Sequence, residues 1–366
     1  MHLRREVREF LSGDPAMRST LSDSWMVYDA EFSRRLGTRG WIGMTWPKRY
    51  GGYERSLLER YVVLEELLAA GAPVAAHWFA DRQVGPMLLR VGTDAQKGTL
   101  LPGIAEGRTC FCIGMSEPNS GSDLASVRTR ARETADAWII SGRKIWVSYA
   151  HHAQFMLLFC RTRDRATNRH EGFSHFVVPM DTPGISVRPI ENLAGEHDFC
   201  EVVLEDVSVP RQSLLGVEGA GWTQVMHELA FERSGPERFL STFVLLQAVV
   251  KHVAARSPAA AAAQVGRLFG HLWTLRRMSI SVAGMLSGQT APDVEAAIVK
   301  DLGTTFEQEV IEVVRSLIDE EPALGEGAGA LAQQLGHAVL HAPLFSLRGG
   351  TREILRTVIS KSVAGK

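Results

Sequence analysis

The segment from Gly114 to Ala125, GMSEPNSGSDLA, constrains this chain more than any other stretch. It places glycines, a proline and small hydroxyl residues directly after the apolar run Cys110–Ile113. These residue types are what turns require, so the segment predicts a connection that follows a strand. Small side chains and exposed main-chain N–H groups also let a planar or phosphorylated ligand approach the backbone closely. Read alone, the segment is therefore either an ordinary turn or a ligand-binding loop.

The region around this segment is rich in short β-type runs, and Gly, Pro and Asp clusters separate them. The runs are Trp138–Ile140, Phe155–Phe159, His175–Val178 and Phe199–Val209. They predict a small antiparallel β domain over residues 109–214. The flanking regions have helical spacing, so the sequence predicts an α+β fold with an N-terminal helical domain (1–108) and a C-terminal helical bundle (215–366).

Apolar residues at helical spacing carry these two helical predictions. The first group is Leu57, Tyr61, Leu64 and Leu68, and the second is Ile298, Leu302, Phe306, Val310, Val313 and Leu317. Between the helices, Asp81, Arg82 and Arg90 are expected on a solvated face.

Composition excludes several classes of function. The 366 residues carry a formal net charge of −1, which argues against a nucleic-acid or anionic-membrane partner. No apolar run is long enough to span a bilayer, and the charged start Met1–Arg8 lacks the apolar segment of a signal peptide, so we expect a cytoplasmic protein. The four cysteines are expected to be buried free thiols, and neither Cys110-x-Cys112 nor His151-His152 predicts a metal site. No strand leads into a Gly-x-Gly-x-x-Gly turn, so a Rossmann site is not expected.

Five motifs occur in an order that resembles the acyl-CoA dehydrogenase family. They are Trp46–Gly52, Gly114–Ala125, Gly142–Ser148, Gly219–Trp222 and Gly350–Ile354. The resemblance covers essentially the whole chain. It implies FAD between the β domain and the C-terminal domain, and a tetramer in which the ADP half of the flavin touches a neighbouring subunit.

The resemblance also implies roles for individual residues. Met115 and Ser116 would contact the edge of the isoalloxazine ring, and Gly121 and Ser122 would lie along the flavin and acyl-CoA path. Trp146 would cover the ring, with Val147 and Ser148 near N5. Further cofactor contacts are expected from Thr351 and Glu353 and, on the adenosine-pyrophosphate side, from Arg256, Gln333 and Gly336.

The catalytic base departs from the pattern of most of the family, in which a Glu precedes the C-terminal Gly-Thr. This chain has Gly349 there, and glycine cannot take a proton. Some family members carry the base on a helix after the Gly-x-Gly-aromatic motif, at a residue followed by Arg. Ungapped counting from Gly219 leads to Glu232, which we predict as the base, with Glu237 as the alternative. Arg233 is predicted to support the charge balance, and Ser122, Arg233 and Gly349 are assigned to the substrate side.

The resemblance thus implies FAD-dependent α,β-dehydrogenation of an acyl-CoA, with flavin N5 as hydride acceptor and an electron-transferring flavoprotein as oxidant. The Gly-Gly-Thr-x-Glu-Ile variant resembles bacterial members that act on bulky acyl-CoAs such as steroid side chains. Some of those are α2β2 heterotetramers, so a homotetramer and a heterotetramer with a second dehydrogenase-like chain both stay open. Two alternative functions also stay open: a non-catalytic partner subunit, and a flavin oxygenase or oxidase on the same fold.

Overall fold

The computed structural model describes residues 2–18, 24–164, 168–256, 259–288, 292–325 and 327–364. The side chains of residues 18, 24, 228–232 and 256 lie outside this description. The chain divides into two compact units. Unit 1 consists of Met1–Asp29, Arg55–Ala75 and Leu229–Lys366, and unit 2 of Ala30–Glu54 and Ala76–Glu228.

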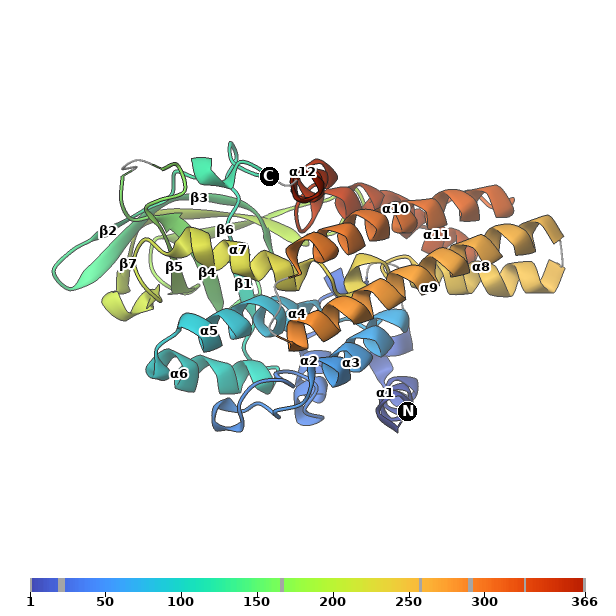
Figure 1. Ribbon diagram of the computed structural model, residues 1–366, viewed down its shortest axis with the longest axis horizontal. Coiled ribbons are helices and arrows are strands. Elements are labelled where there is room, and N and C mark those ends of the chain that lie inside the picture. The colour runs from blue at the N-terminus through green and yellow to red at the C-terminus, as the bar shows by residue number, and fades with distance from the viewer. Residues whose placement is uncertain are drawn as a thin grey trace. The chain divides into compact units, whose positions relative to one another are not determined.

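The described part of unit 2 is built on an eight-stranded sheet (Figure 1). Its strands are β1 (Phe111–Gly114), β2 (Arg130–Glu133), β3 (Ala137–Ser148), β4 (Phe155–Arg161), β5 (Phe173–Pro179), β6 (Ile185–Ile190), β7 (Phe199–Pro210) and β8 (Leu214–Leu215). They pair in the order β6-β7-β3-β2-β4-β5-β8, with β1 beside β4. The four predicted runs all lie in strands, and Trp138–Ile140 and the later Trp146 segment share the single long strand β3.

The sheet is antiparallel as predicted, except where β4 pairs with β1 and with β2. A parallel pairing needs a connection of a dozen or more residues, and the whole β2–β3 hairpin separates β1 from β4. Side chains alternate across the strands, and one face forms the core with buried residues such as Trp138, Ile140, Val147 and Cys160. All four cysteines are buried and free, as expected.

Helices occupy the rest of unit 2. They are α2 (Ala30–Thr38), the single-turn η3 (Lys48–Tyr50), α4 (Ala75–Phe79), the π-helical turn η4 (Ala80–Val84), α5 (Gly85–Val91), α6 (Asp94–Ala105), the short turns η5 (Leu124–Ser126) and η6 (Arg211–Ser213), and α7 (Gly221–Glu232), in which the division between the units falls. Helices α5 and α6 contact each other, and Figure 1 shows them side by side.

The expectation that Asp81 and Arg82 lie on a solvated face is wrong, because both are buried. The Gly43 N–H donates to Asp81 Oδ1 at 2.8 Å, and the Arg82 guanidinium lies 4.8 Å from the centre of the Trp78 ring. Trp78 is one helical turn before Arg82, but Gly43 is 38 residues from Asp81, and sequence periodicity does not connect that pair. Arg90 is exposed, as expected.

His175 on β5 is fully buried, and its Nδ1 lies 2.7 Å from Gln224 Oε1. Burial disfavours the charged imidazolium and lowers the pKa of His175 to about 4. The unfolded chain therefore binds this proton first as the pH falls, and the native state loses about 3 kcal/mol of stability between pH 6.5 and pH 4. We expect His175→Gln to remove this part of the pH dependence in denaturant titrations, and exposed His227→Gln to retain it. If the free energy of unfolding fell equally between pH 6.5 and pH 4 in His175→Gln and in the wild type, the burial argument would be contradicted.

Unit 1 is helical. Its main helices are α1 (His2–Gly13), α3 (Leu57–Ala69), α8 (Phe243–Arg256), α9 (Ala259–Ser287), α10 (Asp293–Leu317), α11 (Ala330–Leu347) and α12 (Arg352–Val363), with the short turns η1 (Pro15–Arg18), η2 (Ser24–Met26) and η7 (Pro236–Arg238). Ser56 begins α3 with a capping box, in which its hydroxyl accepts from the Glu59 N–H and Glu59 accepts from the Ser56 N–H. Helix α10 contacts α8, α9, α11 and α12, so it is the centre of the predicted bundle.

The predicted apolar stripe of α10 is correct for its later half only. Phe306, Val310 and Val313 are buried, but Leu302 is 46 % exposed. The buried line passes instead through Gly303, where an added Cβ would lie 2.2 Å from the Arg238 carbonyl oxygen. A backbone approach this close needs glycine, which a count of apolar side chains does not register.

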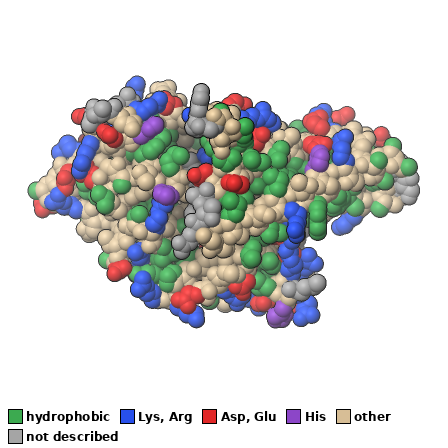
Figure 2. Space-filling model, in the orientation of Figure 1, with side chains coloured by type: hydrophobic (Ala, Val, Ile, Leu, Met, Phe, Trp, Pro, Cys, Tyr) green, Lys and Arg blue, Asp and Glu red, His purple; other side chains and the backbone are tan. Residues whose placement is uncertain are grey.

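The surface agrees with the near-zero net charge. On the face drawn in Figure 2, side chains of both signs are interspersed. Within the described ranges, every helix is too short or too polar to cross a membrane.

Candidate active site

The Gly114–Ala125 loop follows β1 and is held by main-chain hydrogen bonds within unit 2. The Ile145 N–H donates to the Ser116 carbonyl at 3.0 Å, which fixes the start of the loop against β3. Glu117 and Ser120 exchange two main-chain hydrogen bonds of 2.9 and 3.0 Å, which close the turn. The loop thus starts beside the strand that carries Trp146, and the structure brings these two predicted segments together.

Trp146 is the most unusual residue of this region. Its indole is 58 % exposed although it follows the fully buried Lys144 by only two residues. Its φ of 60° is in the left-handed region, which costs a bulky residue of order 1–3 kcal/mol. The β3–β7 register shifts between Lys144 and Val147, and such a bulge re-aims a side chain. One edge contact remains, with the Phe199 ring at 6.2 Å, so most of the indole face is open.

The next two residues of β3 point to opposite faces of the sheet. Val147 is fully buried in the core, so only its main chain is available to a ligand. Ser148 is half-buried and lies on the other face. In the loop, Gly121 and Ser122 are exposed, and a Cβ added at Gly121 would meet nothing within 4 Å. Packing therefore does not explain this glycine. Together these segments present an open aromatic face, half-buried hydroxyls and accessible main chain.

The second group of predicted residues lies in unit 1, around the turn Gly349–Gly350. Gly349 has a φ of 66°, and a Cβ there would lie 2.9 Å from Arg238 Nη2. A Cβ at Gly350 would lie 3.4 Å from Arg233 Nη2. Two guanidinium groups thus pack against the two glycines. Arg233 thus packs beside Gly350, the residue after Gly349. The assignment of Arg233 and Gly349 to the substrate side stays a prediction.

Buried charges from α10 hold the start of this turn. Arg348 Nη2 donates to Glu307 Oε2 at 3.1 Å and to Ser241 Oγ at 2.6 Å. The Lys300 ammonium, which is fully buried, donates to the Phe345 carbonyl at 2.9 Å. Lys300 thus binds a carbonyl of the last turn of α11, where helical hydrogen bonding stops, and Glu307 binds the charged residue that follows the helix.

Motifs and spacing in the sequence do not identify Arg238, Lys300, Glu307 or Arg348 as site residues. A signal exists for two of them: Lys300 and Glu307 are seven residues apart, so they share the buried face of an otherwise amphipathic helix. Charged residues on an apolar face need partners, which makes them candidates for a buried polar cluster.

The predicted base, Glu232, ends α7, and its side chain lies outside the described part of the chain. The same holds for the side chain of Arg256. The alternative base Glu237 is buried, and its Oε1 lies 3.4 Å from Arg238 Nε.

The remaining predicted cofactor residues have structural contacts in unit 1. The Thr351 hydroxyl caps α12 by accepting from the Ile354 N–H, and Glu353 is exposed in the first turn. Hydrogen bonds from its own N–H and from the Thr351 hydroxyl lower the pKa of Glu353. Gln333 Nε2 donates to the Ala328 carbonyl at 3.1 Å, and a Cβ at Gly336 would lie 2.6 Å from the Ala323 carbonyl oxygen. Their contacts with a flavin stay predictions.

We expect Gly349→Ala to lower the melting temperature, because the left-handed φ and the crowding against Arg238 together cost about 1–3 kcal/mol. Gly325→Ala is the matched control, since a Cβ there meets nothing within 4 Å. Differential scanning calorimetry compares the two variants. Equal melting temperatures would show that Gly349 is not constrained by the turn.

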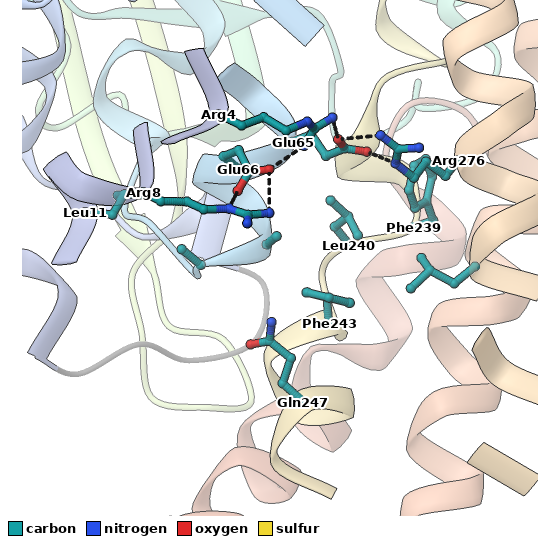
Figure 3. A pocket seen from close by; sticks show the side chains of 13 residues that line it. Arg4, Arg8, Leu11, Glu65, Glu66, Phe239, Leu240, Phe243, Gln247 and Arg276 are labelled. Atoms are coloured by element: carbon teal, nitrogen blue, oxygen red, sulfur yellow. Dashed lines mark hydrogen bonds and ion pairs between the residues drawn. The ribbon is translucent and has the colours of Figure 1, made fainter. Parts of the chain in front are cut away.

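An open pocket of about 500 Å³ lies elsewhere in unit 1 (Figure 3). Its rim carries two carboxylates on α3, of which Glu65 binds Arg4 and Arg276, and Glu66 binds Arg4 and Arg8. These ion pairs join α1, α3 and α9. None of the residues predicted for the site lines this pocket.

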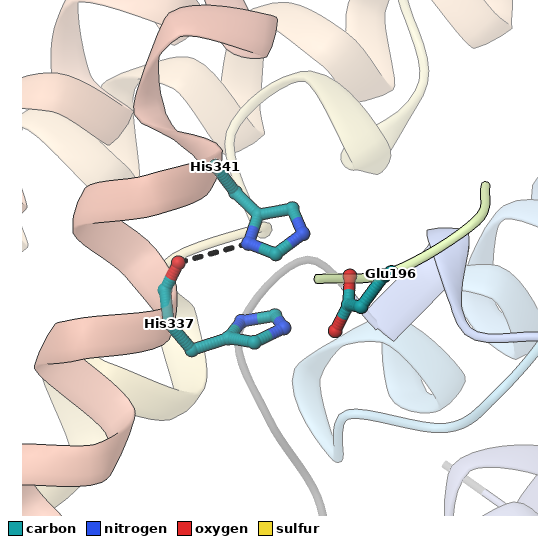
Figure 4. A group of neighbouring side chains, drawn as sticks. All are labelled: Glu196, His337 and His341. Atoms are coloured by element: carbon teal, nitrogen blue, oxygen red, sulfur yellow. Dashed lines mark hydrogen bonds between the residues drawn. The ribbon is translucent and has the colours of Figure 1, made fainter. Parts of the chain in front are cut away.

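Two histidines lie one turn apart on α11 (Figure 4). His337 and His341 are buried with their ring centres 4.0 Å apart, and His341 Nδ1 is 2.9 Å from the His337 carbonyl oxygen. The third residue drawn, Glu196, belongs to unit 2, where its N–H donates to Asn192 Oδ1 at 3.0 Å. The His341 ring and the main chains of His337 and Glu196 thus have hydrogen bonds within their own units.

Comparison with known proteins agrees with this architecture. Residues 1–108 match the acyl-CoA dehydrogenase N-terminal domain, and residues 112–207 match the acyl-CoA dehydrogenase middle domain. The chain is 31 % identical to the acyl-CoA dehydrogenase IpdE1 of Mycobacterium tuberculosis over 340 residues, which cover 91 % of this chain and 87 % of that protein. It is 30 % identical to the acyl-CoA dehydrogenase FadE26 of the same organism, over 99 % of this chain and 96 % of that protein.

Solved structures give the same result. The structure titled Tcur3481-Tcur3483 steroid ACAD is similar with a TM-score of 0.88 and 28 % identity, over all of this chain and 97 % of that chain. The ChsE4-ChsE5 complex from Mycobacterium tuberculosis is similar with a TM-score of 0.85 and 28 % identity, over 100 % of this chain and 97 % of that chain. The chain therefore belongs to the acyl-CoA dehydrogenase family.

Proposed function

We propose that this chain catalyses FAD-dependent α,β-dehydrogenation of an acyl-CoA thioester. The observation that carries the proposal is Trp146, an exposed indole held in a costly left-handed conformation by a bulge beside the Gly114–Ala125 loop. Strain of this kind persists where a function uses it. An open aromatic face suits stacking on a planar ring.

The residues around Trp146 fit a flavin. The Ser116 and Ser148 hydroxyls would bond the polar edge of the ring, with the main chains of Met115 and Val147 beside it. Gly121 and Ser122 leave room for a phosphate or for the acyl-CoA to pass. Thr351 and Glu353, and on the adenosine side Arg256, Gln333 and Gly336, are the further cofactor contacts that we propose. When bound, FAD supplies the hydride acceptor.

The chemistry of the chain itself is removal of the α-proton. That proton is weakly acidic, so its removal needs a carboxylate whose pKa suits the task and donors for the thioester oxygen as negative charge develops. We assign the proton to Glu232. Arg233, whose guanidinium packs against Gly350, balances the charge on this side of the site.

The substrate we propose is a bulky acyl-CoA, such as one with a steroid side chain, with an electron-transferring flavoprotein as oxidant. The support is the Gly349-Gly350-Thr351 variant together with a neighbour whose title names a steroid ACAD.

A non-catalytic partner subunit is the second candidate. Gly349 supplies no base at the usual position, and two neighbours are named as pairs of chains. In that case the chain would complete the site of a second dehydrogenase-like subunit in an α2β2 tetramer.

The test is to purify the chain alone and co-expressed with a dehydrogenase-like chain encoded beside it, and to measure bound FAD per subunit. A flavin-loaded homotetramer supports the catalytic reading. Flavin that appears only in the co-expressed complex supports the partner subunit, and a flavin-free protein in both preparations contradicts both.

A further inference from the structure

Lys144 on β3 is a cation with no access to solvent. Its side chain is fully buried, and its ammonium donates to the Met115 carbonyl at 2.9 Å and to Glu117 Oε1 at 2.9 Å. Both partners belong to the Gly114–Ala125 loop. The buried ammonium of Lys144 on β3 therefore binds the loop through two hydrogen bonds.

Glu117 also binds a third segment of the chain, residues 128–129. It is buried, and its two carboxylate oxygens accept from the Arg128 N–H at 2.6 Å and from the Thr129 N–H at 2.9 Å. Burial alone would raise the pKa of the Glu117 carboxyl, but Lys144 and these donors outweigh it and lower the pKa. Burial lowers the pKa of Lys144, and the adjacent Glu117 opposes that shift. The pair is thus electrostatically coupled and shielded from solvent.

An ion pair is a poor way to fill such a space if stability is the only requirement. Apolar residues of the same volume often serve as well or better, because two buried charges lose their hydration. What an apolar pair would lack is the charge-assisted hydrogen bond to the Met115 carbonyl. That bond acts on the peptide unit between Met115 and Ser116.

Through this peptide, the charge of Lys144 affects the opposite side of the loop. In a trans peptide the C=O and the following N–H point in opposite directions, and the described chain has no cis bonds. With the Met115 C=O directed at Lys144, the Ser116 N–H points away from it. A cation on the carbonyl polarises the peptide and strengthens that N–H as a donor, because hydrogen bonds in a chain polarise one another.

We infer that Lys144 is a positioning residue that orients the Met115–Ser116 peptide and, through it, stabilises negative charge on the ligand bound at Ser116. The inference rests on the proposed function, in which that ligand is the flavin. The flavin gains negative charge on reduction, so Lys144 favours its reduced form, and Glu117 moderates this effect by cancelling part of the positive charge.

The two members of the pair therefore have effects of opposite sign on the midpoint potential of bound FAD. We expect Lys144→Met to shift the potential to more negative values and to weaken FAD binding by about tenfold or more. Glu117→Gln leaves the cation uncompensated, while its one amide oxygen, in the place of Oε1, can still accept from Lys144 and from the Thr129 N–H. We expect this variant to shift the potential to less negative values. A purely structural pair would give changes of the same sign in both variants.

Arg143→Met is the matched control. It removes the same charge from the neighbouring position of β3, but Arg143 is half-exposed and pairs with Glu201 on β7. Solvent screens such pairs, so we expect no change in potential.

The experiment is a spectroelectrochemical titration of the flavin-loaded wild type and the three variants, with a melting curve for each. Opposite shifts in Lys144→Met and Glu117→Gln support the inference. Shifts of the same sign, or wild-type potentials in both, overturn it. If Lys144→Met does not fold, a potential of Glu117→Gln that is unchanged or more negative than the wild type overturns it too. A wild type without flavin, alone or with its partner, contradicts the proposed function instead.

Discussion

Replacing Glu232 by Gln is expected to leave FAD bound while slowing its reduction by acyl-CoA about 10²- to 10⁴-fold, the usual contribution of a positioned general base. Glutamine keeps the shape of the side chain but cannot take the α-proton. Stopped-flow absorbance under anaerobic conditions measures the reduction rate directly, apart from reoxidation.

Glu237→Gln is the comparison that separates the two candidate bases. Glu237 is buried beside Arg238, so neutralising it removes a partner of a buried cation. Loss of such a partner is strongly destabilising, so we expect Glu237→Gln to lower the melting temperature more than the rate of reduction. If acyl-CoA reduced the flavin quickly in Glu232→Gln but slowly in a stable Glu237→Gln, the base would be Glu237.

Trp146→Gly is expected to be more stable than Trp146→Ala by about 1 kcal/mol, which reverses the usual preference within a strand. The φ of 60° strains tryptophan and alanine but not glycine. Both variants lose the indole and are expected to bind FAD at least about tenfold more weakly, because stacking on the ring is lost. Chemical denaturation of the flavin-free proteins and titration with FAD provide the two measurements.

The two readouts test separate statements. If Trp146→Ala is the more stable variant, the left-handed conformation is not imposed by the bulge. If either variant binds FAD as tightly as the wild type, the indole does not cover the ring.

The sequence predicts the architecture well because the architecture follows periodicity. Strands alternate and helices repeat every three to four residues, so the β runs, the α3 spacing and the later half of α10 are visible in the chain itself. The α10 prediction fails at Leu302, where close backbone packing at Gly303, rather than apolar side chains, decides the buried face.

The site is less visible, since it depends on partners distant in sequence. The residues next to Asp81 in the sequence do not predict its burial. It is nevertheless buried, and its carboxylate accepts a hydrogen bond from the distant Gly43 N–H. The register shift that exposes Trp146 is a property of the β3–β7 pairing, which no single strand encodes. Lys144 occupies an ordinary position in a polar-looking segment, and only the fold shows that Glu117 and Met115 surround it.

The central claim is that this chain oxidises an acyl-CoA with its own flavin, and the most direct test is the visible spectrum of the flavin-loaded protein during anaerobic addition of an acyl-CoA panel that includes steroid side-chain thioesters. The expected result is bleaching of the flavin band by at least one bulky acyl-CoA, without oxygen or an added reductant. A flavin that stays oxidised with every member of the panel, yet is reduced by dithionite, would contradict the claim.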